Sequence, residues 1–326
     1  MAVYTHLASH DVENLLSAYD IGEMTSFLGI AEGVENSNYL LVTEKCGVET
    51  KYILTIFEKR VNAEDLPFYL GLMEHLAQAD VLCPLPVLAK DGTMIQKVGT
   101  ENKPAAIVSF LTGRSVRNIQ GGHVREVGAA LANLHLSGKN FALKRANALS
   151  LAGWRKLYEK TAERADEVMP GLQQMIEDEL FFLMEAWPVA SLPSGVIHAD
   201  LFPDNVFFRD GKLSGLIDFY FACNDLWAYD LAITMNAWCF EPDHSFNATK
   251  GRQMLAGYQS VRPLDAAEQE KFPVLARGAS LRFLLTRLHD WLFRVEGALV
   301  TPHDPMVYVK KLQFHRQFEN FKAYGL

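Results

Sequence analysis

Four cysteines are few for a chain of 326 residues, and no two of them form a Cys-x-x-Cys pair. The sequence therefore predicts neither a zinc cluster nor a disulfide framework, and a reducing cytoplasm fits best. Basic residues are not in excess either, because 31 lysines and arginines stand against 39 acids, giving a formal net charge of -8. This balance argues against a general nucleic-acid binder and against an anionic-membrane binder.

Long apolar runs are also missing. No stretch of 18 or more apolar residues occurs, and the first sixteen residues lack a basic segment followed by an apolar run. We therefore expect neither a membrane-spanning segment nor a secretion signal, and we expect small molecules as partners. About half of the residues are apolar, at 49%, so the chain is long enough to bury the cores of two lobes.

The hydrophobic pattern changes along the chain. Short alternating segments in the first third predict a small sheet interrupted by one helix over residues 62–78. From Gly121 onward a period near 3.6 predicts helices, apart from a β hairpin that turns at Asp210-Gly211. We expect an α+β, two-lobe architecture in which residues 1–110 form an antiparallel-sheet lobe and residues 111–326 form a mainly helical lobe.

One constellation carries chemistry within that β interruption. The run from His198 to Asn205 has the pattern His-x-Asp-x-x-x-x-Asn, and Asp218 follows at the end of the hairpin. Phosphoryl transfer needs a carboxylate that accepts the proton of the attacking hydroxyl, and oxygen ligands for magnesium. We interpret Asp200 as the base, Asn205 and Asp218 as magnesium ligands, and His198 as a support that braces the loop by a backbone hydrogen bond.

At these residues the chain resembles the aminoglycoside-phosphotransferase and choline-kinase group of the protein-kinase-like superfamily. Asp230-Leu231-Ala232 resembles the Asp-Leu-Ala that opens a helix behind the catalytic loop in this group, although a plain helix starting at the Asn224-Asp225 cap explains it equally well. The run from Phe219 to Phe240 is similar to homoserine kinases of this type, as are YILTIFEKR and RFLLTRLHDWL. This resemblance implies a two-lobe kinase fold, ATP and Mg²⁺ as cofactors, and L-homoserine as the small-molecule substrate, phosphorylated in threonine biosynthesis.

The nucleotide side departs from the kinase pattern, because Thr55 stands where many relatives have a phosphate-binding lysine. Two alternatives could replace this lysine at the phosphates. One is a basic side chain from a turn (Lys51, Lys59 or Arg60), and the other is the loop at residues 32–38. In that loop Gly33 permits close backbone approach, and Asn36 and Ser37 offer hydrogen bonds, but a polar hairpin explains the loop equally well. The resemblance further implies that adenine packs near Ile53 and Val108, with backbone groups of Ser109 and Leu111 at its edge.

The sequence offers several candidate residues for binding the phosphate acceptor. A zwitterionic amino acid needs a cation for its carboxylate and an acid or amide for its ammonium group. The candidates are Arg282 or Arg287 for the carboxylate, Asn236, Asp225 or Asp290 for the ammonium group, and Asp204 as a further acceptor-side residue. Choline or ethanolamine would instead need rings, for which Trp227, Tyr229, Trp238 and Trp291 are available.

An aminoglycoside acceptor also remains open. A hypothesis of another class is a catalytically silent nucleotide-binding scaffold, motivated by Thr55. The chain is expected to be a monomer or a homodimer.

Overall fold

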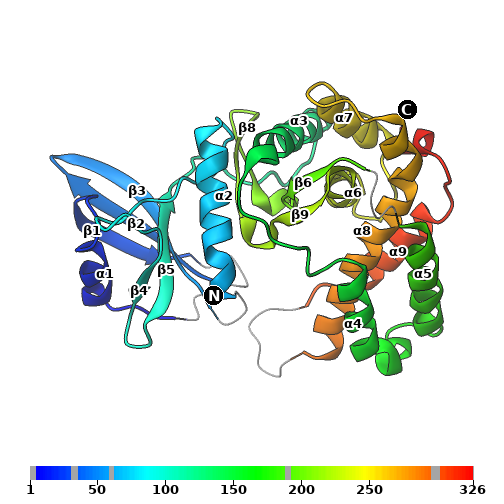
Figure 1. Ribbon diagram of the computed structural model, residues 1–326, viewed down its shortest axis with the longest axis horizontal. Helices are drawn as coiled ribbons and strands as arrows, with labels where there is room; N and C mark the ends of the chain where they lie inside the picture. Colours follow the sequence, from blue (N-terminus) through cyan, green and yellow to red (C-terminus); the bar gives the residue numbers. More distant parts are fainter. Residues whose placement is uncertain (1–4, 31–35, 59–61, 188–191, 295–301, 326) are drawn as a thin grey trace. The chain divides into compact units, whose positions relative to one another are not determined.

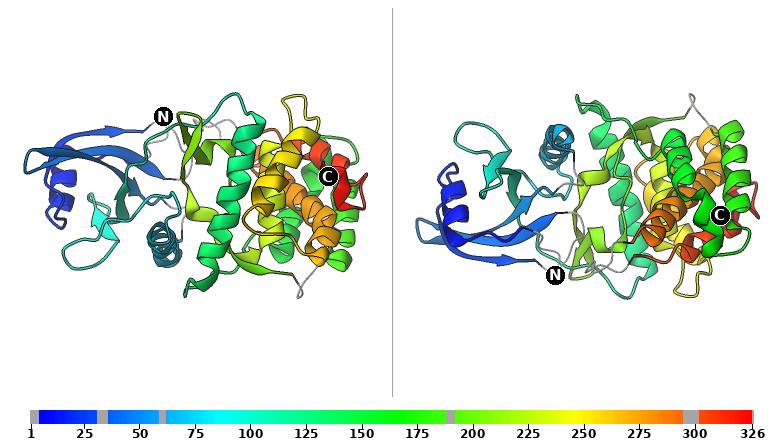
Figure 2. Two further views of the ribbon diagram at one scale, coloured as in Figure 1. Left: turned by 90° about the horizontal axis from the view of Figure 1, so that it is seen from above. Right: turned by 90° about the horizontal axis from the view of Figure 1, so that it is seen from below.

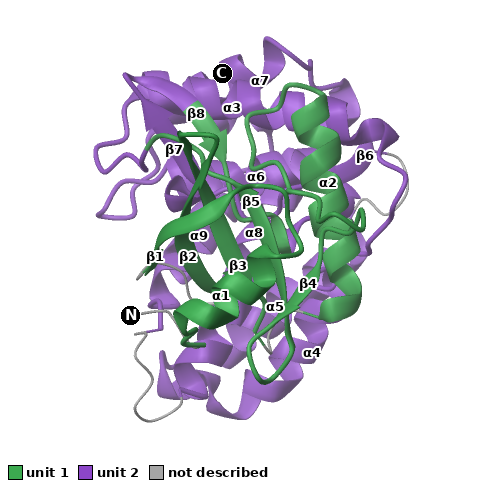
Figure 3. Ribbon diagram, turned by 90° about the vertical axis from the view of Figure 1, so that its left-hand side faces the viewer, with its two compact units in different colours: residues 1–113, 214–220 green, residues 114–213, 221–326 purple. Residues whose placement is uncertain are grey.

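The computed structural model describes residues 5–30, 36–58, 62–187, 192–294 and 302–325 (Figure 1). The chain divides into two compact units (Figure 3): unit 1 is Met1–Gly113 with Ser214–Tyr220, and unit 2 is Arg114–Leu213 with Phe221–Leu326. A functional boundary after residue 110 stays a prediction. The boundary between the compact units falls nearby, after Gly113, but unit 1 also includes residues 214–220.

A five-stranded antiparallel sheet forms the centre of unit 1, in the order β1-β2-β3-β5-β4. Figure 2 shows this sheet, in blue and cyan, from two further directions. Burial alternates along β2, as expected for a strand with one face toward a core. The turn between β2 and β3 has positive φ angles at Cys46 and Gly47, a conformation that suits a tight hairpin. The strands are β1 Glu23–Gly29, β2 Ser37–Lys45, β3 Val48–Ile56, β4 Gln96–Val98 and β5 Lys103–Ser109.

Two helices accompany this sheet. Helix α1 (Ser9–Leu16) contributes Val12 and Leu15 to a core with Leu54 and Ile56 of β3, and each such side chain stabilises the fold by about 1.5–3 kcal/mol when it leaves water. Helix α2 (Leu66–Gln78) follows a 3₁₀ turn whose N-cap is the predicted Asn62, with its side chain accepting from the Glu64 N–H. The predicted helix is therefore confirmed.

Unit 2 contains helices and two short strand pairs. Strand β6 (Ser194–Ile197) pairs antiparallel with β9 (Cys223–Leu226), and β7 (Val206–Arg209) pairs with β8 (Lys212–Leu216) across the predicted turn. Asp210 and Gly211 both have positive φ angles there. The helices are α3 Gly121–Ser137, α4 Leu151–Thr161, α5 Leu172–Ala186, α6 Trp227–Trp238, α7 Ala248–Gln259, α8 Ala266–Leu292 and α9 Met306–His315.

Helices α3 and α7 lie against each other at very short backbone distance. A Cβ atom at Gly257 of α7 would lie 1.9 Å from the carbonyl oxygen of Arg125 in α3, and one at Gly128 of α3 would lie 2.3 Å from the carbonyl oxygen of Met254. Only glycine fits at such a contact. Within this helix pair the Tyr258 hydroxyl of α7 lies 2.8 Å from His135 Nδ1 of α3. Among the described residues, no helix is both long and apolar enough to cross a membrane.

Candidate active site

The segment from His198 to Asn205 connects β6 to β7 and holds two of the predicted catalytic groups side by side. The Asn205 side-chain amide donates to the Asp200 backbone oxygen at 2.9 Å and lies 3.4 Å from Asp200 Oδ2. Pro203 starts the 3₁₀ turn that returns the chain to this position. Because the amide N–H groups of Asn205 face Asp200, its amide oxygen is the atom left for a hard cation.

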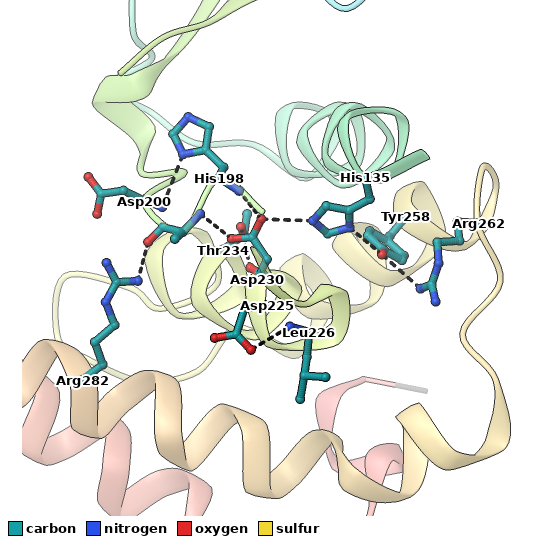
Figure 4. A network of polar contacts seen from close by, with 11 residues as sticks. His135, His198, Asp200, Asp225, Leu226, Asp230, Thr234, Tyr258, Arg262 and Arg282 are labelled. Carbon is teal, nitrogen blue, oxygen red and sulfur yellow. Dashed lines mark hydrogen bonds and ion pairs between the residues drawn. The ribbon is translucent and has the colours of Figure 1, made fainter. Parts of the chain in front are cut away.

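Ala199 has an unusual backbone conformation, with φ at +65°. A left-handed conformation costs a non-glycine residue about 1–2 kcal/mol, so it persists only where partners hold it. The Ala199 N–H donates to Asp230 Oδ1 at 2.8 Å, and the Ala199 carbonyl accepts from Arg282 Nη1 at 2.5 Å (Figure 4). Two charged side chains therefore hold the peptide that precedes the predicted base.

His198 is fully buried and lies beside the base. Its Nδ1 accepts from the Asp200 N–H at 3.3 Å. The expected bracing contact between this histidine and the loop backbone is therefore present. Its buried position fits a positioning role.

Asp230 is the buried carboxylate behind this loop, at 0% exposure. It accepts from the N–H groups of His198 and Ala199 and lies 3.0 Å from His135 Nε2. Burial opposes its ionisation, but the hydrogen bonds from His135 and from the His198 N–H outweigh this and keep the pKa of Asp230 below its usual range. The helix-behind-the-loop interpretation of Asp230-Leu231-Ala232 is confirmed, whereas a helix starting at Asn224-Asp225 is wrong, because those residues lie in β9.

Asp218, the second predicted magnesium ligand, lies in unit 1 and also has a left-handed φ, at +64°. The neighbouring Tyr220 ring packs edge-on against Phe57 and Tyr69, with centroids 5.4 and 5.6 Å apart. Burial and the charge of Asp218 raise the pKa of Tyr220 well above its usual range, and a hydrogen bond with Thr55 opposes the rise. Since Asp200 and Asn205 belong to unit 2, their meeting with Asp218 stays a prediction.

The loop residues expected at the phosphates are turned toward the protein. Ser37 donates to Glu58 Oε1 at 2.7 Å and accepts from the Thr5 N–H, while Asn36 accepts from the Glu58 N–H at 3.3 Å. Both side chains are buried, so a phosphate contact from this loop would use backbone N–H groups. Gly33, and likewise Lys59 and Arg60, lie outside the described residues.

The remaining nucleotide-side candidates lie on β3, on β5 and directly after it. Thr55 donates to Asn38 Oδ1 at 2.8 Å, and Ile53 pairs with Val108 across the two strands. The Ser109 N–H and hydroxyl are already bonded to the Leu85 backbone. The Ser109 N–H is therefore not available for adenine, and Leu111, two residues further on, remains the better candidate for that contact.

On the acceptor side, the two predicted arginines differ. Arg282 is 2% exposed and bonds the Ala199 carbonyl, so it is committed to the loop. Arg287 is half-buried, and its guanidinium lies 4.6 Å from the centre of the Tyr308 ring. Burial lowers the pKa of Arg287, with Tyr308, Asp304 and Asp200 opposing. Within the described ranges, Arg287 makes no hydrogen bond or ion pair.

Tyr308 was not found from the sequence. Its hydroxyl is buried and has no hydrogen-bond partner within the described parts of the chain, and the charges of Arg287 and Asp200 act on it. Asp204 and Asp290 both act electrostatically on His303, which also feels Arg287. Of these residues, Arg287 and Tyr308 interact electrostatically with Asp200. A lone tyrosine in an apolar segment gives no sequence signal for this position.

Asn236 and Asp225 are saturated by other contacts. Asn236 is fully buried, its amide donates to Ser280 at 3.0 Å, and its Oδ1 lies 2.7 Å from His315 Nε2. Asp225 accepts from Asn147 at 2.7 Å and from the Leu226 N–H. These contacts favour structural roles for Asn236 and Asp225.

The rings of Trp227, Tyr229 and Trp238 are buried in α6, so they do not form an open cage for a quaternary amine.

Comparisons with known proteins agree with this geometry. Residues 26–264 match the model of the phosphotransferase enzyme family. Homoserine kinases from Rhizobium etli and Xanthobacter autotrophicus are 58% and 57% identical over 326 residues, covering 100% of this chain and 99% of each relative.

Solved structures extend the likeness in fold. An amicoumacin kinase in complex with AMP-PNP and Ca²⁺ aligns with a TM-score of 0.71 at 17% identity, covering 96% of this chain and 95% of that one. A spectinomycin phosphotransferase in complex with ADP aligns with a TM-score of 0.67 at 10% identity, covering 98% of both chains. At such identities the likeness shows the fold alone, and it confirms the predicted two-lobe α+β class. The chain belongs to the phosphotransferase enzyme family, together with the homoserine kinases that it matches from end to end.

Proposed function

We propose that this chain is a homoserine kinase, which transfers the γ-phosphoryl group of ATP to the side-chain hydroxyl of L-homoserine. The products are ADP and O-phospho-L-homoserine. The observation that carries the proposal is the identity of 55–58% to homoserine kinases over the full length. The pairing of Asp200 with Asn205 supports a phosphotransferase rather than a silent scaffold.

Asp200 is the proposed general base. As the homoserine oxygen forms its bond to the γ-phosphorus, the bond to the leaving ADP oxygen breaks, and Asp200 accepts the hydroxyl proton. Asn205 keeps this carboxylate in place through its amide. Asn205 and Asp218 supply an amide and a carboxylate oxygen, which are donors that suit Mg²⁺. When bound, this ion would neutralise charge on the phosphates.

Arg287 is the proposed partner of the homoserine carboxylate. It is a half-buried cation without an ion-pair partner in the described chain, and it acts electrostatically on Asp200. A guanidinium binds a carboxylate through two parallel hydrogen bonds, which fixes orientation as well as affinity. Asp204, the middle residue of the 3₁₀ turn Pro203–Asn205, is the proposed partner of the ammonium group. The substrate hydroxyl would then be directed toward Asp200.

An ADP-release assay across acceptors tests the function. L-Homoserine should exceed choline, ethanolamine and kanamycin in kcat/KM, and Asp200→Asn should lower kcat by roughly 10²-fold or more while magnesium-ATP still binds. Arg164→Gln is the control, because it removes a partly exposed arginine that pairs with Glu167 and bonds the Leu292 carbonyl. Turnover of another acceptor in preference to homoserine would refute the substrate, and ATP binding without turnover of any acceptor would favour the scaffold.

A further inference from the structure

A line of buried polar contacts leads from Asp230 away from the catalytic loop (Figure 4). His135 Nε2 lies 3.0 Å from Asp230 Oδ2, and His135 Nδ1 lies 2.8 Å from the Tyr258 hydroxyl. Arg262 Nη1 donates to the same hydroxyl at 3.1 Å. His135, Asp230 and Tyr258 each have 0% exposure, so water does not compete for these contacts.

The donors and acceptors in this line allow one arrangement of protons when His135 is neutral. Arg262 can only donate, so the Tyr258 oxygen accepts from it. The Tyr258 hydrogen then points to His135 Nδ1, which must carry a lone pair. The histidine proton is therefore on Nε2, where it donates to the Asp230 carboxylate. The opposite tautomer would place a lone pair against that carboxylate.

The far end of the line is anchored on helix α8. Arg262 Nη2 contacts both oxygens of Glu268 at 2.8 and 2.9 Å, and Glu268 forms the capping box of α8 with Asp265. Arg282, further along the same helix, bonds the Ala199 carbonyl. Helix α8 is thus connected to Ala199 in two ways. Arg282 bonds the Ala199 carbonyl directly, and Glu268 is linked to the Ala199 N–H through the line of side chains that ends at Asp230.

The groups around His135 favour its neutral form. Burial lowers its pKa, and the charge of Arg262 adds to this, although Asp230 opposes both. Glu268 neutralises Arg262 at the outer side, and the Trp227 ring stacks on the imidazole with its plane 7° away from parallel. Protonation of Nδ1 would also break the hydrogen bond from Tyr258 and leave that hydroxyl hydrogen without an acceptor in the line.

We propose that His135 is a positioning residue for the catalytic base, held in the Nε2–H tautomer by Tyr258 and Arg262. In this state it orients the Asp230 carboxylate, which holds the N–H groups of His198 and Ala199. The strained peptide at Ala199 is thereby fixed, and with it the place of Asp200. This inference rests on the proposed phosphotransferase function, because that function makes Asp200 the base.

Nitrogen-15 NMR of the histidine side chains in the full-length protein tests the tautomer without any assay of turnover. His135 is assigned by its loss in His135→Gln. At pH 7 the wild-type signal should be that of neutral imidazole protonated at Nε2. Tyr258→Phe should give a mixture of tautomers and a higher pKa, since Nδ1 no longer accepts a hydrogen bond. An Nδ1–H tautomer or an imidazolium in the wild-type protein would overturn the proposal.

Kinetics test the consequence for catalysis. Tyr258→Phe, which removes one oxygen atom, should lower kcat roughly tenfold with little change in the KM for ATP, since one buried hydrogen bond is lost. In a plot of kcat against pH, the acidic limb of Tyr258→Phe should move toward neutral pH. His135→Gln keeps a donor toward Asp230 and should retain more activity than His135→Leu.

Tyr324→Phe is the matched control, because it removes a buried hydroxyl 3.0 Å from another histidine, His315, which lies outside this line. It should leave kcat and the pH profile unchanged. Equal losses in Tyr258→Phe and Tyr324→Phe, or an unshifted profile in Tyr258→Phe, would refute the positioning role. If wild-type protein turned over no acceptor, the proposed function would fail, while the NMR result would still decide the tautomer.

Discussion

Replacing Arg287 with glutamine should separate binding from stability. In the wild-type protein the guanidinium is half-buried, stacks on Tyr308 at 4.6 Å and has no ion-pair partner among the described residues. Removing one partner of a desolvated charge pair costs about 2–5 kcal/mol of binding. With each 1.36 kcal/mol worth tenfold, about 3 kcal/mol corresponds to a loss of roughly 10²-fold in kcat/KM for L-homoserine.

The same change should not destabilise the free protein. Burial of this cation opposes folding more than Tyr308, Asp304 and Asp200 offset it, as the lowered pKa of Arg287 indicates, so Arg287→Gln should have an equal or higher Tm. Residues that serve a ligand at the expense of the fold behave in this way. A structural arginine would give the opposite pattern, with a lower Tm and an unchanged KM.

Substrate analogues make the assay specific. 2-Amino-1,4-butanediol keeps the ammonium group and the C4 hydroxyl of homoserine but carries a second hydroxyl in place of the carboxylate. Wild-type enzyme should use it poorly, and Arg287→Gln should impair it far less than L-homoserine. Arg164→Gln again serves as the control. An equal loss with both acceptors would refute a carboxylate contact and assign Arg287 to the general electrostatics around Asp200.

Three further changes have defined outcomes. Asp218→Asn should raise the Mg²⁺ concentration needed for half-maximal rate, and an unchanged titration would remove Asp218 as a ligand. Gly257→Ala should lower the free energy of unfolding by about 1–3 kcal/mol, because the added methyl group forces α3 and α7 apart. Denaturant unfolding measures this change, and an unchanged free energy would contradict the close packing. Burial lowers the pKa of Lys311 to about 7, so the unfolded chain binds the extra proton between about pH 7 and 10.5, and stability should rise with pH there. Lys311→Met should abolish that rise, and a wild-type Tm that falls over this window would refute the assignment.

The catalytic loop was readable from sequence because its signals are local. The five-residue spacing from Asp200 to Asn205 fits a single turn, and Asp210-Gly211 fixes the hairpin that follows. Both depend on short-range backbone geometry, which residue type largely determines. The bracing by His198 was likewise a contact within two residues.

The acceptor side was less readable because its contacts join distant segments. Tyr308 reaches Arg287 only when α9 packs on α8, and no local pattern reports that. The proposal that Asn236 binds the substrate overlooked the character of its helix. Eleven of the twelve residues of α6 are buried. A helix that is apolar on every side lies inside the protein, so its polar side chains bond to the core rather than to a substrate.

Thr55, which departs from the kinase pattern on the nucleotide side, contacts Tyr220. Tyr220 bonds to Thr55, and Thr55 in turn donates to Asn38 Oδ1, so the tyrosine lies beside the strand position at which the kinase resemblance led us to expect a lysine. Thr55 is only 3% exposed, so a lysine at this position would have to desolvate its ammonium group at a large cost. The tyrosine also ties the segment bearing Asp218 to β3. Thr55 therefore provides the contact that joins Tyr220, two residues after the proposed magnesium ligand Asp218, to β3.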